Sequence, residues 1–279
     1  MADIPVAVPA HRLDRPEVFL VDPAVRRRRR EQIVVRVSQA VLCIVVLGLW
    51  ELTSGGLFDD FWISTPSQIF LALVRLFSGG QLMEALGITM LEVFVGFLFG
   101  ALIGCVLGLV LGINPLVARV LDPFLLGLYA LPRIALLPLF ILWFGIGLEM
   151  KVVFTALLVF FPIFMNTLSG VRDVDRDLID VLRVMGARPM ETVRKVYIPS
   201  ALAWVFAGLR ISVPFALIGA VVAEMFSSNR GLGYLISLSA NQFDTAGLFA
   251  ALLVTTLVGL ILDALVRRIE KYLLRWQPA

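Results

Sequence analysis

Four charged side chains lie inside apolar stretches of this sequence, where a charge is costly and therefore informative. They are Glu92, Arg133, Arg210 and Glu224. A charge at the centre of a bilayer costs at least about 2.5–3.5 kcal/mol on insertion scales, so each should face protein or a water-filled path. Two interpretations stay open. Either the four pair with one another and hold a helix bundle together, or some of them, Arg133 first, line a path for an anionic or polar solute.

The side chains that usually carry catalysis or bind metals are scarce. The single histidine, His11, lies in a polar segment, which leaves no material for a histidine triad or a histidine-ligated metal. Cys43 and Cys105 both lie in apolar windows and are expected to pack as small apolar residues. The chain contains no G-x-x-x-x-G-K-[ST] phosphate loop. We therefore expect no catalytic residue, metal or bound cofactor, and an intramembrane enzyme is the least supported class.

The composition places these charges in a membrane protein. The chain has 279 residues, 59% of them hydrophobic and 16% charged, whereas soluble domains are about 45–50% apolar and about 25% charged. A bilayer core of about 30 Å needs about 20 apolar residues per helix. The windows of that kind predict an all-α membrane protein with six transmembrane helices, at Val37–Thr53, Leu86–Gly112, Val120–Phe144, Val152–Leu168, Ala201–Ala223 and Leu248–Val266.

The basic residues predict that both termini are cytoplasmic. With six spans, most of the 24 lysines and arginines fall in residues 1–36, at Arg119, in 172–195 and in 267–275, all on one side. This agrees with the positive-inside rule, and Arg75, Lys151 and Arg230 are assigned to the other side. Residues 1–32 are expected to form a disordered cytoplasmic tail whose arginine run lies near anionic lipid. Nucleic-acid binding by that run is an alternative that the sequence does not require. Residues 33–279 are expected to form one six-span membrane domain that includes a cytoplasmic insert at about 172–199.

Glycine and proline patterns single out two spans and one short helix. Five glycines, 96, 100, 104, 108 and 112, recur at steps of four and should permit close helix packing. Because four residues turn about 400°, this ridge drifts about 40° per step, and we expect it to serve two neighbouring helices in turn. Pro123, Pro132 and Pro138 predict a broken third span. Thr65-Pro66-Ser67-Gln68 predicts the start of a short helix on the outer membrane surface.

A polar insert at about 172–199 separates the fourth and fifth spans. Leu178, Val181, Leu182 and Met185 recur at i, i+3, i+4 and i+7, as in an amphipathic helix. Gly186 can end that helix in a left-handed conformation, and Pro189 suits the first turn of a second one. That second helix would carry Met190, Val193, Val196 and Tyr197 on its apolar face. Two short helices at a fixed bend could dock in a partner's groove or rest on the inner membrane surface, and both readings stay open.

The insert resembles the cytoplasmic EAA loop of ABC importer permeases. In that pattern Asp180-Val181-Leu182 take the places of Glu-Ala-Ala, Gly186 is the glycine, and Val196, Ile198 and Pro199 match the end. The segments "LPRIALLPLFILWFGIG", "GLRIS", "AEMF" and "GLGYLI" extend the resemblance from about Pro66 to Trp276, to permeases of the nitrate, taurine and aliphatic sulfonate group. The insert's first triplet departs from the pattern, because valine and leucine replace two alanines.

The resemblance implies the transmembrane domain of a type I ABC importer in the cell inner membrane. It implies a second permease subunit, two cytoplasmic ATPase subunits that bind ATP and magnesium, an external substrate-binding protein, and no nucleic-acid partner. ATPase coupling would fall on Leu178, Asp180, Val181, Leu182, Met185, Gly186, Ala187, Pro189 and Met190.

The substrate is left open by this resemblance. A small anionic or polar solute such as nitrate, taurine or a sulfonate is the first expectation, and a thiamine precursor or riboflavin is the alternative. A stand-alone channel or secondary carrier that uses Arg133, Glu92 and Glu224 is the alternative from another class.

Overall fold

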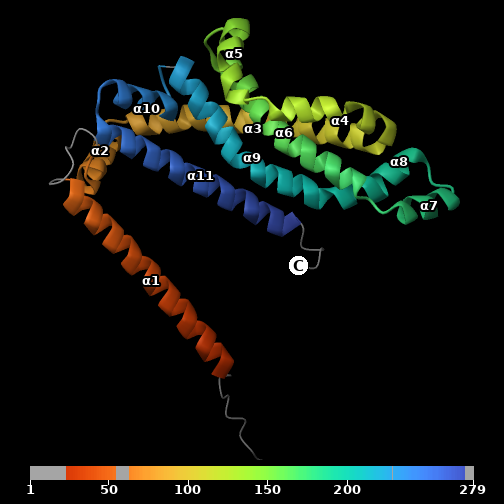
Figure 1. Ribbon diagram of the computed structural model, residues 1–279, viewed down its shortest axis with the longest axis horizontal. Coiled ribbons are helices and arrows are strands. Elements are labelled where there is room, and N and C mark those ends of the chain that lie inside the picture. The colour runs from red at the N-terminus through yellow and green to blue at the C-terminus, as the bar shows by residue number, and fades with distance from the viewer. Residues whose placement is uncertain (1–22, 55–62, 228, 274–279) are drawn as a thin grey trace, which may run out of the picture. The chain divides into compact units, whose positions relative to one another are not determined.

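The computed structural model describes residues 23–54, 63–227 and 229–273, which contain helices joined by short turns (Figure 1). The chain divides into two units, Met1–Thr53 and Ser54–Ala279. The first contains α1, Pro23–Ser54, whose segment from Glu31 is long and apolar enough to span a membrane. The expected tail over residues 1–32 lies mostly outside the described residues. Within the described residues, α1 begins at Pro23.

The second unit holds the remaining helices. They are α2 (Pro66–Ser78), α3 (Gln81–Ile113), α4 (Pro115–Ala130), the 3-10 turn η1 (Arg133–Leu136), α5 (Leu137–Phe144), α6 (Leu148–Arg172), α7 (Arg176–Val184), α8 (Pro189–Thr192), the π-helical turn η2 (Val193–Tyr197), α9 (Ile198–Ser227), α10 (Leu232–Asn241) and α11 (Thr245–Leu273). Five helices of the described chain are long and apolar enough to cross a membrane, and the bent pair α4–α5 makes a sixth pass if counted as one.

Helices α3 and α6 run parallel in a constant register. A Cβ added at Gly96, Gly100, Gly104, Gly108 or Gly112 would meet, in that order, Thr155, Val159, Ile163, Thr167 and Val171 at 2.6–3.2 Å. Each partner lies 59 residues later in the chain, the same separation as that between Glu92 and Lys151 at the start of the two helices. The glycines are therefore needed because the α6 backbone and side chains occupy the space of a side chain.

This register corrects the expectation that the glycine ridge serves two neighbours in turn. All five glycines face α6. The expected drift of about 40° per step assumed that the neighbouring helix is straight. In the structure the contact residues on α6 also recur every four residues, so both rows turn by the same angle. Two ridges with a period longer than 3.6 residues stay in contact when the helices coil around each other in the right-handed sense.

The parallel register also shows that the broken segment crosses the bundle. The start of α3 lies beside the start of α6, and their ends lie together at Gly112 and Val171. The chain between Ile113 and Leu148 must therefore return along the length of α3. It does so through α4 and η1–α5, which are bent by 81° where Pro132 interrupts the backbone ladder. The prediction of a broken third span is confirmed.

Helix α9 completes the core by packing antiparallel to α6. Trp204 fills the space above Gly170 near one end, and Gly219 lies against Thr155 near the other. Between them the Ser212 hydroxyl donates to the Val159 carbonyl oxygen at 3.3 Å. Helices α10 and α11 cover this core from the far end of α9, and the predicted helix α2 begins as expected, with Thr65 Oγ1 accepting from the Gln68 amide at 3.2 Å.

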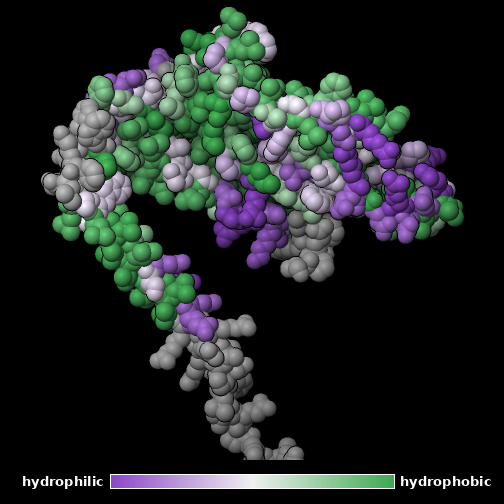
Figure 2. Space-filling view, in the orientation of Figure 1, coloured by the Kyte–Doolittle hydropathy of each residue, from purple (hydrophilic) through white to green (hydrophobic). Residues whose placement is uncertain are grey.

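Polar side chains gather at one end of this second unit. Figure 2 shows hydrophilic side chains over α7, α8 and the last turns of α11, while the flanks of the long helices are mostly hydrophobic. The ends of α3, α6 and α11 and the start of α9 all lie toward this end (Figure 1). We call it the basic end, because it carries Arg119, Arg172, Arg176, Arg183, Arg188, Arg194, Lys195, Arg267, Arg268 and Lys271.

Candidate functional site: the α7–α8 insert and the charges behind it

The insert folds as two helices at a bend, with both ends of the first helix capped. Asp175 Oδ1 accepts from the Asp177 amide at 2.9 Å, which caps the start of α7. At the other end the Gly186 amide donates to the Arg183 carbonyl and the Ala187 amide to the Leu182 carbonyl, both at 3.0 Å. This is a Schellman motif, and Gly186 has the left-handed φ of 76° that it requires. The predictions for Gly186 and for a helix starting at Pro189 are confirmed.

The first helix exposes its apolar face. Leu178, Val181 and Met185 are exposed, and Leu182 is half-buried beside them; we call these four residues the α7 stripe. Val184 at 89% exposure and Met190, on α8, extend this apolar surface. An exposed apolar surface of this size on a polar segment indicates a contact with something else.

The second helix does not present the single apolar face that was expected. A π-helical turn follows α8 directly and changes the spacing of its side chains. Val196 is buried, Tyr197 faces a cavity described below, and Met190 alone of that set is fully exposed.

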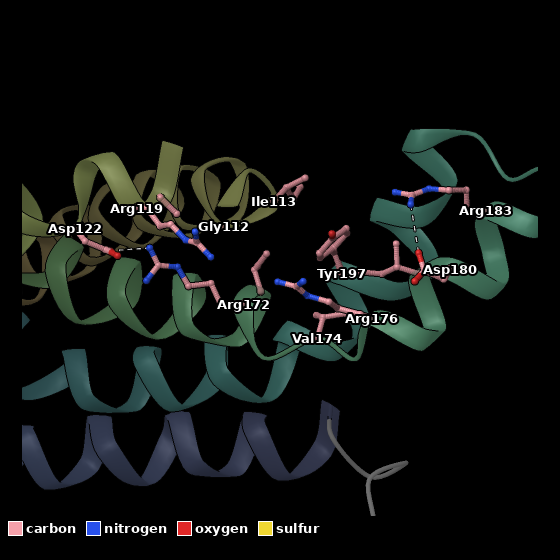
Figure 3. Close-up of a pocket in the computed structure, with 13 residues that line it drawn as sticks. Gly112, Ile113, Arg119, Asp122, Arg172, Val174, Arg176, Asp180, Arg183 and Tyr197 are labelled. Atoms are coloured by element: carbon pink, nitrogen blue, oxygen red, sulfur yellow. Dashed lines mark hydrogen bonds and ion pairs between the residues drawn. The ribbon is translucent and has the colours of Figure 1, made fainter. Parts of the chain in front are cut away.

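A cavity of about 720 Å³ lies on the opposite face of α7 (Figure 3). The α7 residues that line it are Arg176, Ile179, Asp180 and Arg183. Each of them precedes a residue of the α7 stripe by two positions, an offset of about 200° around the helix. Asp180, expected beside the stripe, therefore faces the cavity and accepts from Arg183 at 3.3 Å. The other walls come from the end of α3, the start of α4, the end of α6 and Tyr197.

A buried ion pair joins α3 to α6 at the far end of the second unit. The Lys151 ammonium donates to Glu92 Oε1 at 2.7 Å, and Glu92 is only 1% exposed. Sequence reasoning placed Lys151 in the outer segment before the fourth span, but the residue lies in the first turn of α6 and is buried. Glu92 thus has an ion-pair partner, but that partner is neither of the two arginines that sequence reasoning considered.

Glu224 is held in the same region by neutral donors. Thr89 Oγ1 donates to Glu224 Oε1 at 2.7 Å and accepts from the Leu232 amide at 2.9 Å. The Gly233 amide donates to Glu224 Oε2 at 2.7 Å. The carboxyl group therefore binds the first turn of α10, where helix amides are unpaired and favour a negative charge. A Cβ at Gly231 would lie on this carboxyl group, which explains the glycine at that position.

The two arginines do not complete an ion-pair network. The Arg133 guanidinium lies over the Tyr129 and Phe161 rings, 5.0 Å and 4.9 Å from their centroids, and donates to the Tyr129 carbonyl oxygen at 3.4 Å. Its Nη1 is buried without a hydrogen-bond partner among the described residues. Arg210 is exposed on α9 and makes no ion pair in the described part of the chain. Among the described residues neither arginine pairs with Glu92 or Glu224, so the interpretation in which the four charges pair with one another is not supported.

Sequence reasoning missed Lys151 and Thr89, the two residues that bind Glu92 and Glu224. Lys151 had a usable signal, since it begins a four-residue series with Thr155 and Val159 that matches the series of Glu92 with the glycines. Thr89 carried no signal, because a threonine in an apolar helix often bonds its own backbone.

These features define a class: a polytopic helical membrane protein with a broken span and a capped, two-helix polar insert. Residues 96–275 match the family of binding-protein-dependent transport system inner membrane components. The putative aliphatic sulfonates transport permease protein of Bacillus subtilis is 35% identical over 85% of this chain and 86% of its own length. The formylaminopyrimidine transport permease protein of Halalkalibacterium halodurans is 33% identical over 84% and 93%. The chain belongs to this family and is a multi-pass permease subunit of an ABC importer in the cell membrane.

The fold agrees with a solved importer. An inward-facing structure of the MetNI methionine ABC transporter superposes with a TM-score of 0.54 at 22% identity, covering 72% of this chain and 95% of that one. The likeness shows the fold of a type I ABC importer permease. Family membership decides among the classes that the sequence left open: the chain is an importer permease, and the stand-alone channel, the secondary carrier and the intramembrane enzyme are no longer needed as alternatives.

Proposed function

We propose that this subunit couples ATP hydrolysis by separate cytoplasmic ATPase subunits to import through the α7 stripe. The observation that carries the proposal is the exposure of Leu178, Val181 and Met185 on a helix whose ends are fixed by Asp175 and Gly186. An amphipathic helix that offers apolar anchors at i, i+3 and i+7 fits a groove on a partner. The caps hold the helix at a fixed angle, so a movement of the partner is passed to α6 and α9.

The orientation follows from the charges. The basic end contains the insert, the end of α6 and the basic turns of α11, and basic residues near spans favour the cytoplasmic side. The proposed orientation puts the C-terminus and the insert in the cytoplasm, and with six passes the N-terminus as well. The opposite end, with α2 and α10, receives substrate from an external binding protein. Two copies of this subunit, each with one ATPase subunit, form the importer.

The experiment for coupling is co-purification of the permease with its ATPase subunit. Val181→Glu and Met190→Glu place a charge in the docking surface and should abolish co-purification and ATP-dependent uptake, because the carboxylate would be buried without a partner. Gln242→Glu adds the same charge to an exposed residue at the end of α10, away from the insert, and should leave co-purification unchanged. Retained association and full uptake in both Val181→Glu and Met190→Glu would overturn the proposal.

A small anionic solute is the proposed cargo, with Arg133 as the candidate path residue. Its guanidinium stands at the break between α4 and α5, with Nη1 lacking a hydrogen-bond partner among the described residues. A broken helix commonly lines a cavity, and an arginine there favours an anion. The similarity to a permease named for aliphatic sulfonates agrees with this. The relative named for formylaminopyrimidine supports the alternative, a neutral or aromatic compound.

The cargo is tested by uptake with the cognate binding protein in proteoliposomes. Arg133→Gln should lower sulfonate uptake by about tenfold or more, as expected for loss of one charged contact. Arg210→Gln serves as the matched control for loss of an intramembrane arginine. If sulfonates are not transported and a pyrimidine is, the alternative cargo replaces the first, while the coupling proposal is unaffected.

A further inference from the structure

The cavity behind α7 contains two cations that the protein does not neutralise. Four arginines and two aspartates line it. Arg172 pairs with Asp122 at 2.7 Å and Arg183 with Asp180 at 3.3 Å. Arg119 and Arg176 make no ion pair or hydrogen bond within the described chain, and Figure 3 shows both guanidinium groups reaching into the cavity. The cavity therefore presents an excess of two positive charges.

Two arginines from separate elements suit a phosphate group. Arg119 comes from α4 and Arg176 from the start of α7, so the two planar forks approach the cavity from different walls. Guanidinium groups bind phosphate oxygens with paired hydrogen bonds, more strongly than a single ammonium does. Bringing two unpaired cations together is unfavourable without an anion, so an anionic ligand would relieve that repulsion.

The surface beside Arg119 indicates where the ligand comes from. Leu116, Val120 and Phe124 are all exposed and recur every four residues along α4. Around the axis of α4, Arg119 lies between this apolar row and the side that faces the cavity. The cavity side carries Asp122 and the buried Ala118. A molecule with a phosphate in the cavity could therefore lay an acyl chain along α4. A soluble phosphate would make no use of that row.

We propose that this cavity is a binding site for the headgroup of an anionic phospholipid. The phosphate lies between Arg119 and Arg176, and an acyl chain lies along Leu116, Val120 and Phe124. Basic pockets between membrane helices on the cytoplasmic side are known to hold such headgroups. Because the ligand would contact α4, α6 and α7 together, it would brace the insert against the spans from the face opposite the α7 stripe.

The test is native mass spectrometry of the full-length permease released from nanodiscs that contain phosphatidylglycerol and phosphatidylcholine. The unmodified chain should retain phosphatidylglycerol selectively. Arg119→Gln/Arg176→Gln should weaken that retention by about tenfold or more, since each substitution removes the charge-assisted hydrogen bonds of one guanidinium to the phosphate. Arg194→Gln/Arg268→Gln removes the same charge from exposed positions outside the cavity and should keep retention within about twofold. Size-exclusion profiles establish that each variant is folded.

Several outcomes would overturn the site. Equal loss in both double variants would mean that retention reflects general surface charge. Displacement of the lipid by millimolar inorganic phosphate alone would assign the cavity to a soluble anion. Unchanged lipid retention together with lost ATPase co-purification in the Arg119/Arg176 variant would assign it to the protein partner. Lipid retention is measured on the permease alone, so its failure is distinct from a failure of the coupling proposal.

Discussion

The Lys151 ammonium donates to Glu92 Oε1 at 2.7 Å across the same 59-residue register that pairs Gly96, Gly100, Gly104, Gly108 and Gly112 of α3 with α6. The charge pair is thus the first contact of a continuous helix–helix interface. Over the next four turns, glycines of α3 pack against β-branched residues of α6. Because the register is parallel, it also fixes the direction of the chain between the two helices. This one contact therefore connects the intramembrane charges to the topology of the importer.

Breaking this ion pair from one side should destabilise the protein strongly. Lys151→Met leaves the buried Glu92 carboxylate without its partner, for which soluble proteins lose about 3–5 kcal/mol. The double variant Glu92→Met/Lys151→Met should recover most of that loss. The measurement is the temperature at which the detergent-solubilised protein loses its monodisperse size-exclusion peak. A double variant as unstable as Lys151→Met would show that the pair does more than neutralise itself.

Close packing of α3 on α6 predicts a position-dependent effect of alanine. A Cβ at Gly100 would lie 2.5 Å from the Ala156 carbonyl oxygen, so Gly100→Ala should cost about 1–3 kcal/mol by forcing the helices apart. Gly87 lies on the same helix with nothing within 4 Å, and Gly87→Ala should be neutral or stabilising by about 0.5–1 kcal/mol. The same thermal assay compares them. Similar behaviour of the two variants would contradict the register.

Thr89 should tether the start of α10 to Glu224. Thr89→Val keeps the side-chain shape but removes the hydroxyl that donates to Glu224 and accepts from the Leu232 amide. Both buried groups then lack a hydrogen-bond partner, which should lower the stability by about 1–3 kcal/mol. Hydrogen exchange at the first turn of α10 should accelerate by at least about fivefold, and Thr89→Ser should restore protection. If valine leaves exchange at the rate of the unmodified protein, the tether is not what orders this turn.

The bend at Gly186 should tolerate asparagine far better than valine. Its φ of 76° costs other residues about 1–2 kcal/mol, least for asparagine, and an added Cβ would meet nothing within 4 Å. We expect Gly186→Val to reduce ATPase co-purification and coupled uptake, while Gly186→Asn retains most of both. A new side chain at this position would not clash with neighbouring residues, so the two variants differ mainly in how well they adopt the left-handed conformation. Equal activity of the two variants would therefore mean that the bend angle is unimportant for coupling.

Much of the fold could be predicted from residue patterns, because membranes and helix ends impose local rules. Twenty apolar residues need a helix in lipid, a glycine with positive φ can end one, and prolines interrupt one. The span positions, the α7 cap at Gly186 and the start of α8 at Pro189 were therefore predicted from the chain alone. The family resemblance was carried by the same segments and is confirmed by the match over residues 96–275.

Contacts between distant residues depended on the three-dimensional arrangement. The partner of Glu92 is 59 residues away and that of Glu224 is 135 residues away, and no local spacing encodes either pairing. The glycine series indicated close packing, but only the three-dimensional arrangement showed that all five of these glycines face α6. Likewise, Arg119 and Arg176 belong to separate helices, and they share a cavity because α4 and α7 flank the ends of α3 and α6.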